Sequence, residues 1–303
     1  MKSGKLFSGC FLGLTTYDIF YEVEKLPGIN SKEMALDQHA SSGGPATNAA
    51  IAFSLVGGNS LLVSIIGQHP VSRIIRDDLA QYAVDLIDLD PDPTILPVIS
   101  SIMILKGTGS RSVLYTDTAK RQIKNLPEGL YRRPFEIVLV DGHQMELSKQ
   151  LCSFARRENI PCVLDGGSWK DGTEELLQHI DYAICSEDFL PPGCSSSSDA
   201  VSYLKEQAVR GIAITRGEKP VLFSDQGVDG FVDIANQSNI RSTLGAGDIF
   251  HGSFCYFLLS SGGNFQLALK KASEVATLSC KYLDTRSWAS DPDLQKIISG
   301  ADQ

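Results

Sequence analysis

A loop of small residues runs into an apolar helix late in the chain, and this loop carries the clearest reactive pattern. The run is Gly245-Ala246-Gly247-Asp248. Glycines here permit positive φ and let a ligand approach the backbone closely. The first amides of the following helix have no helical partner and lie at the positive end of its dipole. We therefore expect an anion-binding site at this loop, of the kind that accepts a phosphate group.

Asp248 would stand in the first turn of that helix, beside the anion site. It could cap the helix and complement the dipole, or it could accept a proton from a hydroxyl that attacks a bound phosphoryl group. A dinucleotide-binding fingerprint is the obvious rival for this loop. That fingerprint requires a third glycine, where this chain has Phe250, and an apolar strand upstream, where residues 236–241 are largely polar. The pattern favours phosphoryl transfer over dinucleotide binding.

Two earlier features could contact a substrate with several hydroxyl groups. The pair Gly43-Gly44 opens a predicted helix that has Asn48 in its first turn. This pair is either a tight loop before a closely packed helix or a set of donors for substrate hydroxyls. Asp18 follows the first predicted strand. It is either a turn residue or an acceptor for two adjacent hydroxyls, because a carboxylate has two accepting oxygens.

Short apolar runs alternate with helical patterns and so predict where these residues lie. Strands are expected at 6–14, 61–66, 99–105, 136–140, 162–164, 182–185 and 212–215, with residues 15–23 as a continuation or turn. Helices are expected at 46–56, 71–82, 145–157, 174–179, 198–210, 248–259, 265–283 and 294–298. This alternation predicts an α/β fold with a mostly parallel sheet covered on both faces. Ligands bind beyond the carboxyl ends of such strands, where Asp18, Asp141, Asp165 and Ser186 fall.

The composition narrows the classes of protein. The 303 residues, 43% hydrophobic and 21% charged, suit one large globular domain or two compact ones. The net charge of -9 disfavours nucleic acid as a partner. The seven cysteines form no C-x-x-C pair, which predicts free thiols rather than a zinc site. No signal peptide and no apolar stretch of about 20 residues is visible, so we expect a cytoplasmic protein without a membrane span.

The order of these motifs resembles the ribokinase/PfkB family of carbohydrate kinases. The resemblance rests on Asp18, on Gly43-Gly44-x-x-x-Asn48 and on Thr243-x-Gly245-Ala246-Gly247-Asp248, and it extends over about residues 6–285. The late motif is fairly specific. The resemblance implies a single ribokinase-like α/β domain over 1–303, with a central mostly parallel sheet flanked by helices and a small β-sheet lid formed from about 15–42 and 98–117.

By this resemblance the chain would phosphorylate a hydroxyl on a sugar or sugar-like small molecule, with ATP as donor. Asp248 matches the general base, and the amides of Gly245, Ala246 and Gly247 match the anion hole. The magnesium ion would be carried largely by the ATP phosphates and water. The matching substrate positions are Asp18, Gly43, Gly44 and Asn48, and the matching nucleotide positions are Thr215, Gly217 and Ser186. Glu187 is a weak candidate for the metal site, and a surface carboxylate is the alternative that its position favours.

Some residues depart from the family pattern or leave alternatives open. Ser242 stands where the family usually has an aspartate that helps to bind a monovalent cation, so a need for potassium is left open. Arg111 lies on the expected lid and could either meet a charged group on the substrate or be solvated. The alternatives are a nucleoside kinase of the same fold and a catalytically silent sugar-binding relative. Beyond sugar and ATP, the resemblance implies a homodimer formed through the lid.

Overall fold

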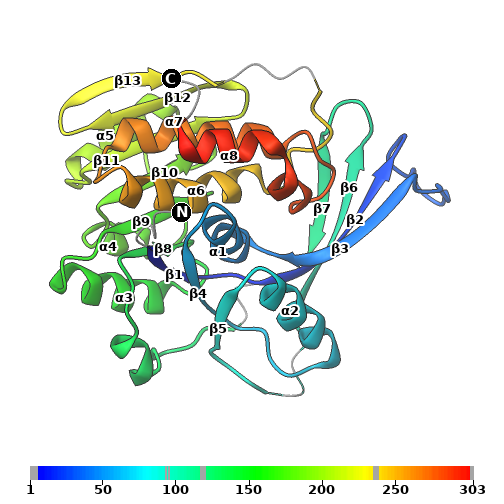
Figure 1. Cartoon of the computed structure of the whole chain (residues 1–303), viewed down its shortest axis with the longest axis horizontal. Coiled ribbons are helices and arrows are strands. Elements are labelled where there is room, and N and C mark those ends of the chain that lie inside the picture. The colour runs from blue at the N-terminus through cyan, green and yellow to red at the C-terminus, as the bar shows by residue number, and fades with distance from the viewer. Residues whose placement is uncertain (1–5, 93, 95, 117–120, 235–238, 301–303) are drawn as a thin grey trace.

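A computed structural model describes residues 6–92, 94, 96–116, 121–234 and 239–300. A nine-stranded sheet runs through the body of the molecule in the order β13-β12-β11-β10-β9-β8-β1-β4-β5 (Figure 1). All neighbours from β11 to β5 pair in parallel, and only the β11-β12-β13 end is antiparallel. The predicted mostly parallel sheet is thus confirmed. The strands are β1 (Ser8–Leu12), β4 (Asn59–Ser64), β5 (Val84–Asp88), β8 (Ile137–Val140), β9 (Cys162–Gly166), β10 (Tyr182–Ser186), β11 (Gly211–Arg216), β12 (Lys219–Asp225) and β13 (Val228–Val232).

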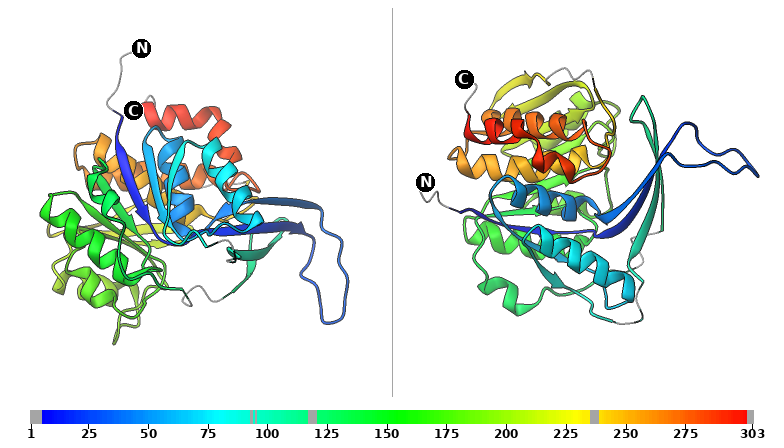
Figure 2. Two further views of the ribbon diagram at one scale, coloured as in Figure 1. Left: turned by 90° about the horizontal axis from the view of Figure 1, so that it is seen from below. Right: turned by 45° about the vertical axis from the view of Figure 1, so that its right-hand side comes forward.

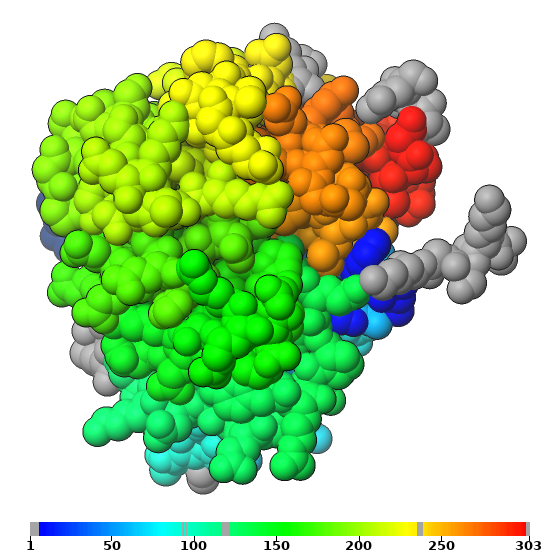
Figure 3. Space-filling view, turned by 90° about the vertical axis from the view of Figure 1, so that its left-hand side faces the viewer, coloured from blue at the N-terminus to red at the C-terminus, as the bar shows by residue number. Residues whose placement is uncertain are grey.

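Helices cover both faces of this sheet. The helices are α1 (Pro45–Leu55), α2 (Pro70–Gln81), α3 (Met145–Arg157), α4 (Thr173–Leu177), α5 (Ser197–Glu206), α6 (Ala246–Ser260), α7 (Phe265–Ser279) and α8 (Pro292–Ser299), with 3-10 turns η1 (Glu128–Arg132) and η2 (Ser287–Ser290). Successive residues of a strand face opposite sides. Leu139 accordingly belongs to the core cluster that includes residues of α1, α6 and α7, whereas Val140 belongs to the cluster that includes residues of α3 and α5. Figure 3 shows the face away from the second sheet, where the green-to-yellow middle of the chain makes most of the surface.

A second sheet of four strands projects from one side of the body (Figures 1 and 2). Its order is β3-β2-β6-β7, formed by β2 (Thr16–Val23), β3 (Asp37–Gly43), β6 (Val98–Leu105) and β7 (Arg111–Tyr115). Residues 15–23, predicted as a continuation of the first strand or a turn, instead form a strand of the second sheet, because the chain leaves the large sheet after Leu12 and enters the second sheet at Thr16. That this sheet moves as a lid stays a prediction, and position 117 of the predicted lid lies outside the described residues.

Helices α1 and α6 pack closely, and this packing sets the geometry of the site. A Cβ at Gly252 of α6 would lie 2.0 Å from the carbonyl oxygen of Ala49 of α1, so only glycine permits the observed approach. Both helices are buried over much of their length. Their contact brings the first turn of α1 beside the first turn of α6, although about 200 residues separate them. No helix of the described chain is both long and apolar enough to cross a bilayer.

Candidate active site

The predicted base and the predicted substrate amide meet at the amino-terminal end of α6. Asn48 Nδ2 donates a hydrogen bond to Asp248 Oδ2 at 2.8 Å. No described residue donates to the second oxygen, Oδ1 of Asp248. The Oδ2 atom of Asp248 is therefore held in place by Asn48, while its Oδ1 atom remains available to a ligand.

The loop before Asp248 leaves part of the helix end open to an anion. Gly245 precedes α6 with φ +69°, and no side chain caps the helix. Gly247 is helical, so the expected positive φ occurs at Gly245 and not at Gly247. The Ala246 amide already donates to the Thr243 carbonyl at a long 3.4 Å. The end of α6 has the unpaired amides and dipole that attract a phosphate.

The surroundings of Asp248 make its carboxyl group a stronger base than an ordinary aspartate. Burial is the main cause that raises the pKa of Asp248 to about 6, and the negative charge of Asp165 adds to it. The Asn48 hydrogen bond and the charges of His251 and Arg111 act in the opposite direction. A group with a pKa near 6 is deprotonated at neutral pH yet basic enough to accept a proton from a hydroxyl.

Asp18 lies at the foot of the second sheet, in contact with the glycine pair. Its side chain is only 9% exposed, and its Oδ1 accepts a hydrogen bond from Thr16 Oγ1 at 2.6 Å. A Cβ at Gly43 would lie 1.9 Å from Asp18 Oδ2, so glycine is required to leave room for this carboxylate. Burial raises the pKa of Asp18. Asp18, Gly43 and Gly44 thus form one wall beside the start of α1.

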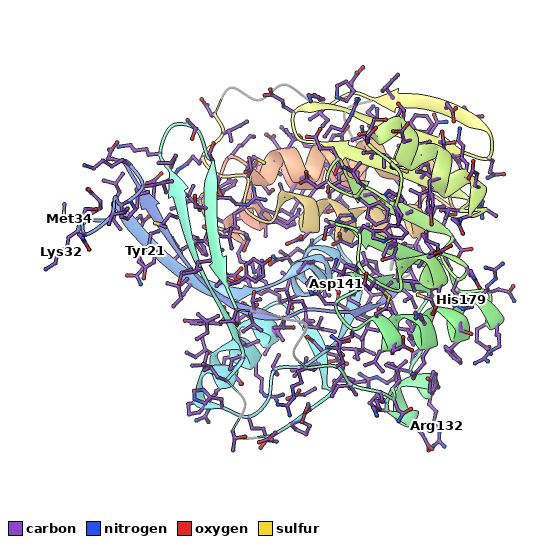
Figure 4. The ribbon with its side chains drawn as sticks, turned by 180° about the vertical axis from the view of Figure 1, so that it is seen from behind. Tyr21, Lys32, Met34, Arg132, Asp141 and His179 are labelled. Carbon is purple, nitrogen blue, oxygen red and sulfur yellow. The ribbon has the colours of Figure 1, made fainter. Side chains whose placement is uncertain are left out.

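Asp141 has a structural role. Its Oδ2 accepts from the backbone amides of Leu14, at 2.8 Å, and Ala46, at 3.3 Å, and its Oδ1 accepts from the His143 amide at 2.9 Å. These bonds join the end of β1 to the start of α1. Figure 4 places Asp141 near the middle of the molecule, whereas Lys32 and Met34 lie at the far tip of the projecting loop.

The predicted nucleotide positions gather at the carboxyl ends of β10 and β11. Ser186 and Thr215 are register partners on these strands, and Gly217 follows in the exposed turn before β12. Ser186 Oγ donates to the Gly167 carbonyl at 2.7 Å. The Thr215 hydroxyl donates to the Cys185 carbonyl at 3.3 Å. These residues lie at the carboxyl-terminal ends of their strands. Asp165 lies at the same end of the sheet, on β9, with its carboxylate near His251 of α6.

Glu187 is exposed and lies 3.8 Å from the Lys219 ammonium. Within the described residues, no three histidine, cysteine or acidic side chains come together as a metal cage.

Two arginines lie at the site although their positions carry no local motif. Arg111, on β7 of the second sheet, donates to the Thr243 hydroxyl at 2.8 Å and so reaches the loop before α6. Arg111 is exposed, and its contact with a charged group on the substrate stays a prediction. Arg286, in the segment after α7, is 9% exposed and donates to Asn48 Oδ1 at 3.0 Å. No sequence pattern pointed to Arg286, because its contact partner lies 238 residues away.

Comparison with known proteins agrees with the geometry. The sequence model of the pfkB family of carbohydrate kinases matches residues 8–292 of this chain. The ribokinase of Dictyostelium discoideum is 22% identical, over 88% of this chain and 92% of its own. The deoxyribokinase of Salmonella typhi is 23% identical, over 81% and 83% respectively.

A solved structure of Arabidopsis thaliana ribokinase, complexed with ribose and ATP, superposes with a TM-score of 0.79. It is 19% identical, and the superposition covers 99% of this chain and 100% of that one. At this identity the likeness establishes the fold, which is the predicted ribokinase-like α/β fold with a large mostly parallel sheet and a smaller second sheet. Since the family match spans nearly the whole chain, the protein belongs to the pfkB family of carbohydrate kinases and is a sugar kinase.

Proposed function

We propose that this protein transfers the γ-phosphoryl group of ATP to a hydroxyl of a sugar or sugar-like small molecule, with Asp248 as the general base. The observation that carries the proposal is the Asp248 carboxylate, held by Asn48 on one oxygen and set at the uncapped start of α6. A base and an anion site are the two groups that this reaction requires side by side.

In the proposed reaction, Asp248 takes the proton of the substrate hydroxyl as its oxygen forms a bond to the γ-phosphorus. The bond from that phosphorus to the bridging oxygen breaks, and ADP leaves. The amides of Gly245, Ala246 and Gly247 would stabilise the negative charge on the migrating group. Arg111, which reaches Thr243 from the second sheet, would add positive charge there when the sheet closes.

We further propose that the sugar binds between the foot of the second sheet and the start of α1. Asp18 offers acceptors that are already desolvated by burial, so hydroxyl donors would bind it well. Gly43, Gly44 and Asn48 line the same wall. Relatives named ribokinase and deoxyribokinase make pentoses the first sugars to test.

ATP would lie over the carboxyl ends of β10 and β11, with Thr215, Gly217 and Ser186 near its adenosine and phosphates. The complex of the Arabidopsis relative with ribose and ATP supports this choice of donor. Bound magnesium would neutralise charge on the β- and γ-phosphates. The cytoplasm, where ATP is abundant, suits a chain whose seven cysteines are all free.

The test is an ADP-release screen with magnesium and ATP over pentoses, hexoses, sugar acids, sugar phosphates and nucleosides. The expected result is turnover with at least one sugar, and a kcat lowered about 100-fold or more in Asp248→Asn, with ATP still bound. Turnover restricted to nucleosides would replace the sugar kinase by a nucleoside kinase. Near-normal turnover by Asp248→Asn would refute the assignment of the base.

A further inference from the structure

Arg286 is a buried cation that joins three parts of the site. Its Nη1 donates to Asn48 Oδ1 on α1 at 3.0 Å, and its Nη2 donates to the Ser42 carbonyl on β3 at 2.7 Å. Nη1 also donates to the Thr285 hydroxyl at 2.9 Å. The guanidinium therefore connects the C-terminal segment with the foot of the second sheet and with the residue that contacts the base.

These contacts determine which way the Asn48 amide points. A guanidinium has only donors, so the atom of Asn48 that faces Arg286 must be the oxygen. The amide nitrogen is then the atom that faces Asp248, at 2.8 Å. The ionised Asp248 carboxylate can only accept, so it favours the same orientation, and Arg286 reinforces that orientation from the opposite side of the amide.

We propose that Arg286 is a positioning residue for the phosphoryl transfer: it orients Asn48 as a donor to Asp248 and ties that orientation to the foot of the second sheet. The inference rests on the proposed role of Asp248 as base. Arg286 would act on the same sugar substrate, because its contact Ser42 adjoins Gly43 and Gly44 on the proposed sugar-binding wall.

The second connection runs through Ser42 and Asp78. Asp78 of α2 accepts hydrogen bonds from the Ser42 amide at 2.9 Å and from the Ser42 hydroxyl, and it lies 4.0 Å from Arg286. The guanidinium also lies over the Tyr82 ring, 5.5 Å from its centroid. A buried cation held by so many groups has little freedom, so a displacement of β3 would be transmitted to Asn48.

The orientation of Asn48 has a measurable electrostatic consequence. A donor at 2.8 Å stabilises the charged carboxylate, and this hydrogen bond is one of the causes that lower the pKa of Asp248. The other charged groups that act on Asp248 are Asp165 on β9, His251 on α6 and Arg111 on β7. None of these contacts Arg286. Loss of the Arg286 contact should therefore raise the pKa of Asp248 through Asn48 alone.

The test compares Arg286→Gln and Arg286→Lys with Asn48→Ala and with the double variant Arg286→Gln/Asn48→Ala. Arg286→Lys keeps the charge but cannot bind Asn48 and Ser42 with two separate groups. The expected result for each single variant is a kcat lowered about tenfold or more. The acid limb of the pH profile for kcat should move up by about half a unit or more. The double variant should be within about twofold of Asn48→Ala, since both changes remove the same interaction.

Arg76→Gln is the matched control, because Arg76 also bridges a backbone carbonyl, that of Gly67, and a carboxylate, that of Asp88, but on α2 away from the base. Circular dichroism and ATP-induced thermal shift establish that each variant folds. If Arg286→Gln does not fold, the Arg286→Lys profile decides. Folded Arg286 variants with an unmoved acid limb, or losses that multiply in the double variant, would overturn the proposal. An active Asp248→Asn would instead remove the proposed function itself.

Discussion

His251 and Asp165 face each other beneath the candidate base. His251 Nδ1 lies 3.4 Å from Asp165 Oδ2, and neither atom has a hydrogen-bond partner among the described residues. His251 Nε2 lies 3.0 Å from the Ile184 carbonyl, which can only accept, so Nε2 carries a proton. A neutral imidazole would then turn a bare nitrogen toward a carboxylate. The two buried groups lie within ion-pair distance but form no hydrogen bond with each other.

Asp165→Asn should lower the pKa of Asp248. The charge of Asp165 raises that pKa more than the charge of His251 lowers it, so removal of the carboxylate favours the deprotonated base. The acid limb of kcat should move to lower pH by about half a unit. The measurement is kcat between pH 5 and 8. Asp85→Asn, which changes an exposed carboxylate paired with Arg133, is the control and should not move the limb.

Asp248→Asn should stabilise the folded protein at neutral pH. The folded pKa of Asp248 is about 6, above its value in an unfolded chain, so the folded state binds the proton more tightly. The charged carboxylate therefore costs stability above pH 6, and this cost disappears as the pH falls toward 4. Denaturant unfolding should show a gain on the order of 1–3 kcal/mol at pH 7.5 and little gain at pH 4. An equal gain at both pH values would contradict the shift.

Gly252→Ala should reduce both stability and activity. Its Cβ would lie 2.0 Å from the Ala49 carbonyl oxygen, so α1 and α6 must separate, and with them Asn48 and Asp248. The expected loss is about 1–3 kcal/mol of unfolding free energy, with kcat lowered more than the KM for ATP is changed. Gly129→Ala is the control, because a Cβ there meets nothing within 4 Å. Equal behaviour of the two variants would mean that the helices adjust freely.

The second sheet should mediate a homodimer. Its edge strand β7 exposes Val113, Leu114 and Tyr115, with Leu114 73% exposed. An apolar edge strand tends to pair with another chain. Sedimentation velocity should show a dimer that Leu114→Glu shifts toward monomer. Val228→Glu, on the edge strand of the large sheet, is the matched control. A monomer at all concentrations would reject this surface.

The large sheet was predictable because its buried strands have a local signature. Ile137–Val140 and Gly211–Arg216 are apolar runs between helical patterns, and both are strands where expected. Strand β5, Val84–Asp88, was not predicted, since acidic residues interrupt it at the sheet edge. The change of sheet between Leu12 and Thr16 also has no local signal. It depends on Asp141, whose carboxylate holds the Leu14 amide from 127 residues away.

In the candidate site, too, some residues could be predicted from the sequence and others could not. Asn48 and Asp248 were recognisable because glycine-rich motifs accompany them, and the structure brings them together. Arg286 and the Asp165–His251 pair depend on contacts between distant elements, which neither composition nor spacing reveals. The role of a buried charged residue can be recognised only when the groups that surround it in the fold are known.

The central claim is that Asp248 takes the proton of the acceptor hydroxyl. Its most direct test is the single-turnover rate of phosphoryl transfer from γ-labelled ATP to the sugar identified by the screen, in wild type and in Asp248→Asn, with both substrates saturating. The expected rate in Asp248→Asn is about 100-fold or more below that of wild type, with ATP affinity retained. A transfer rate within a few-fold of wild type would contradict it.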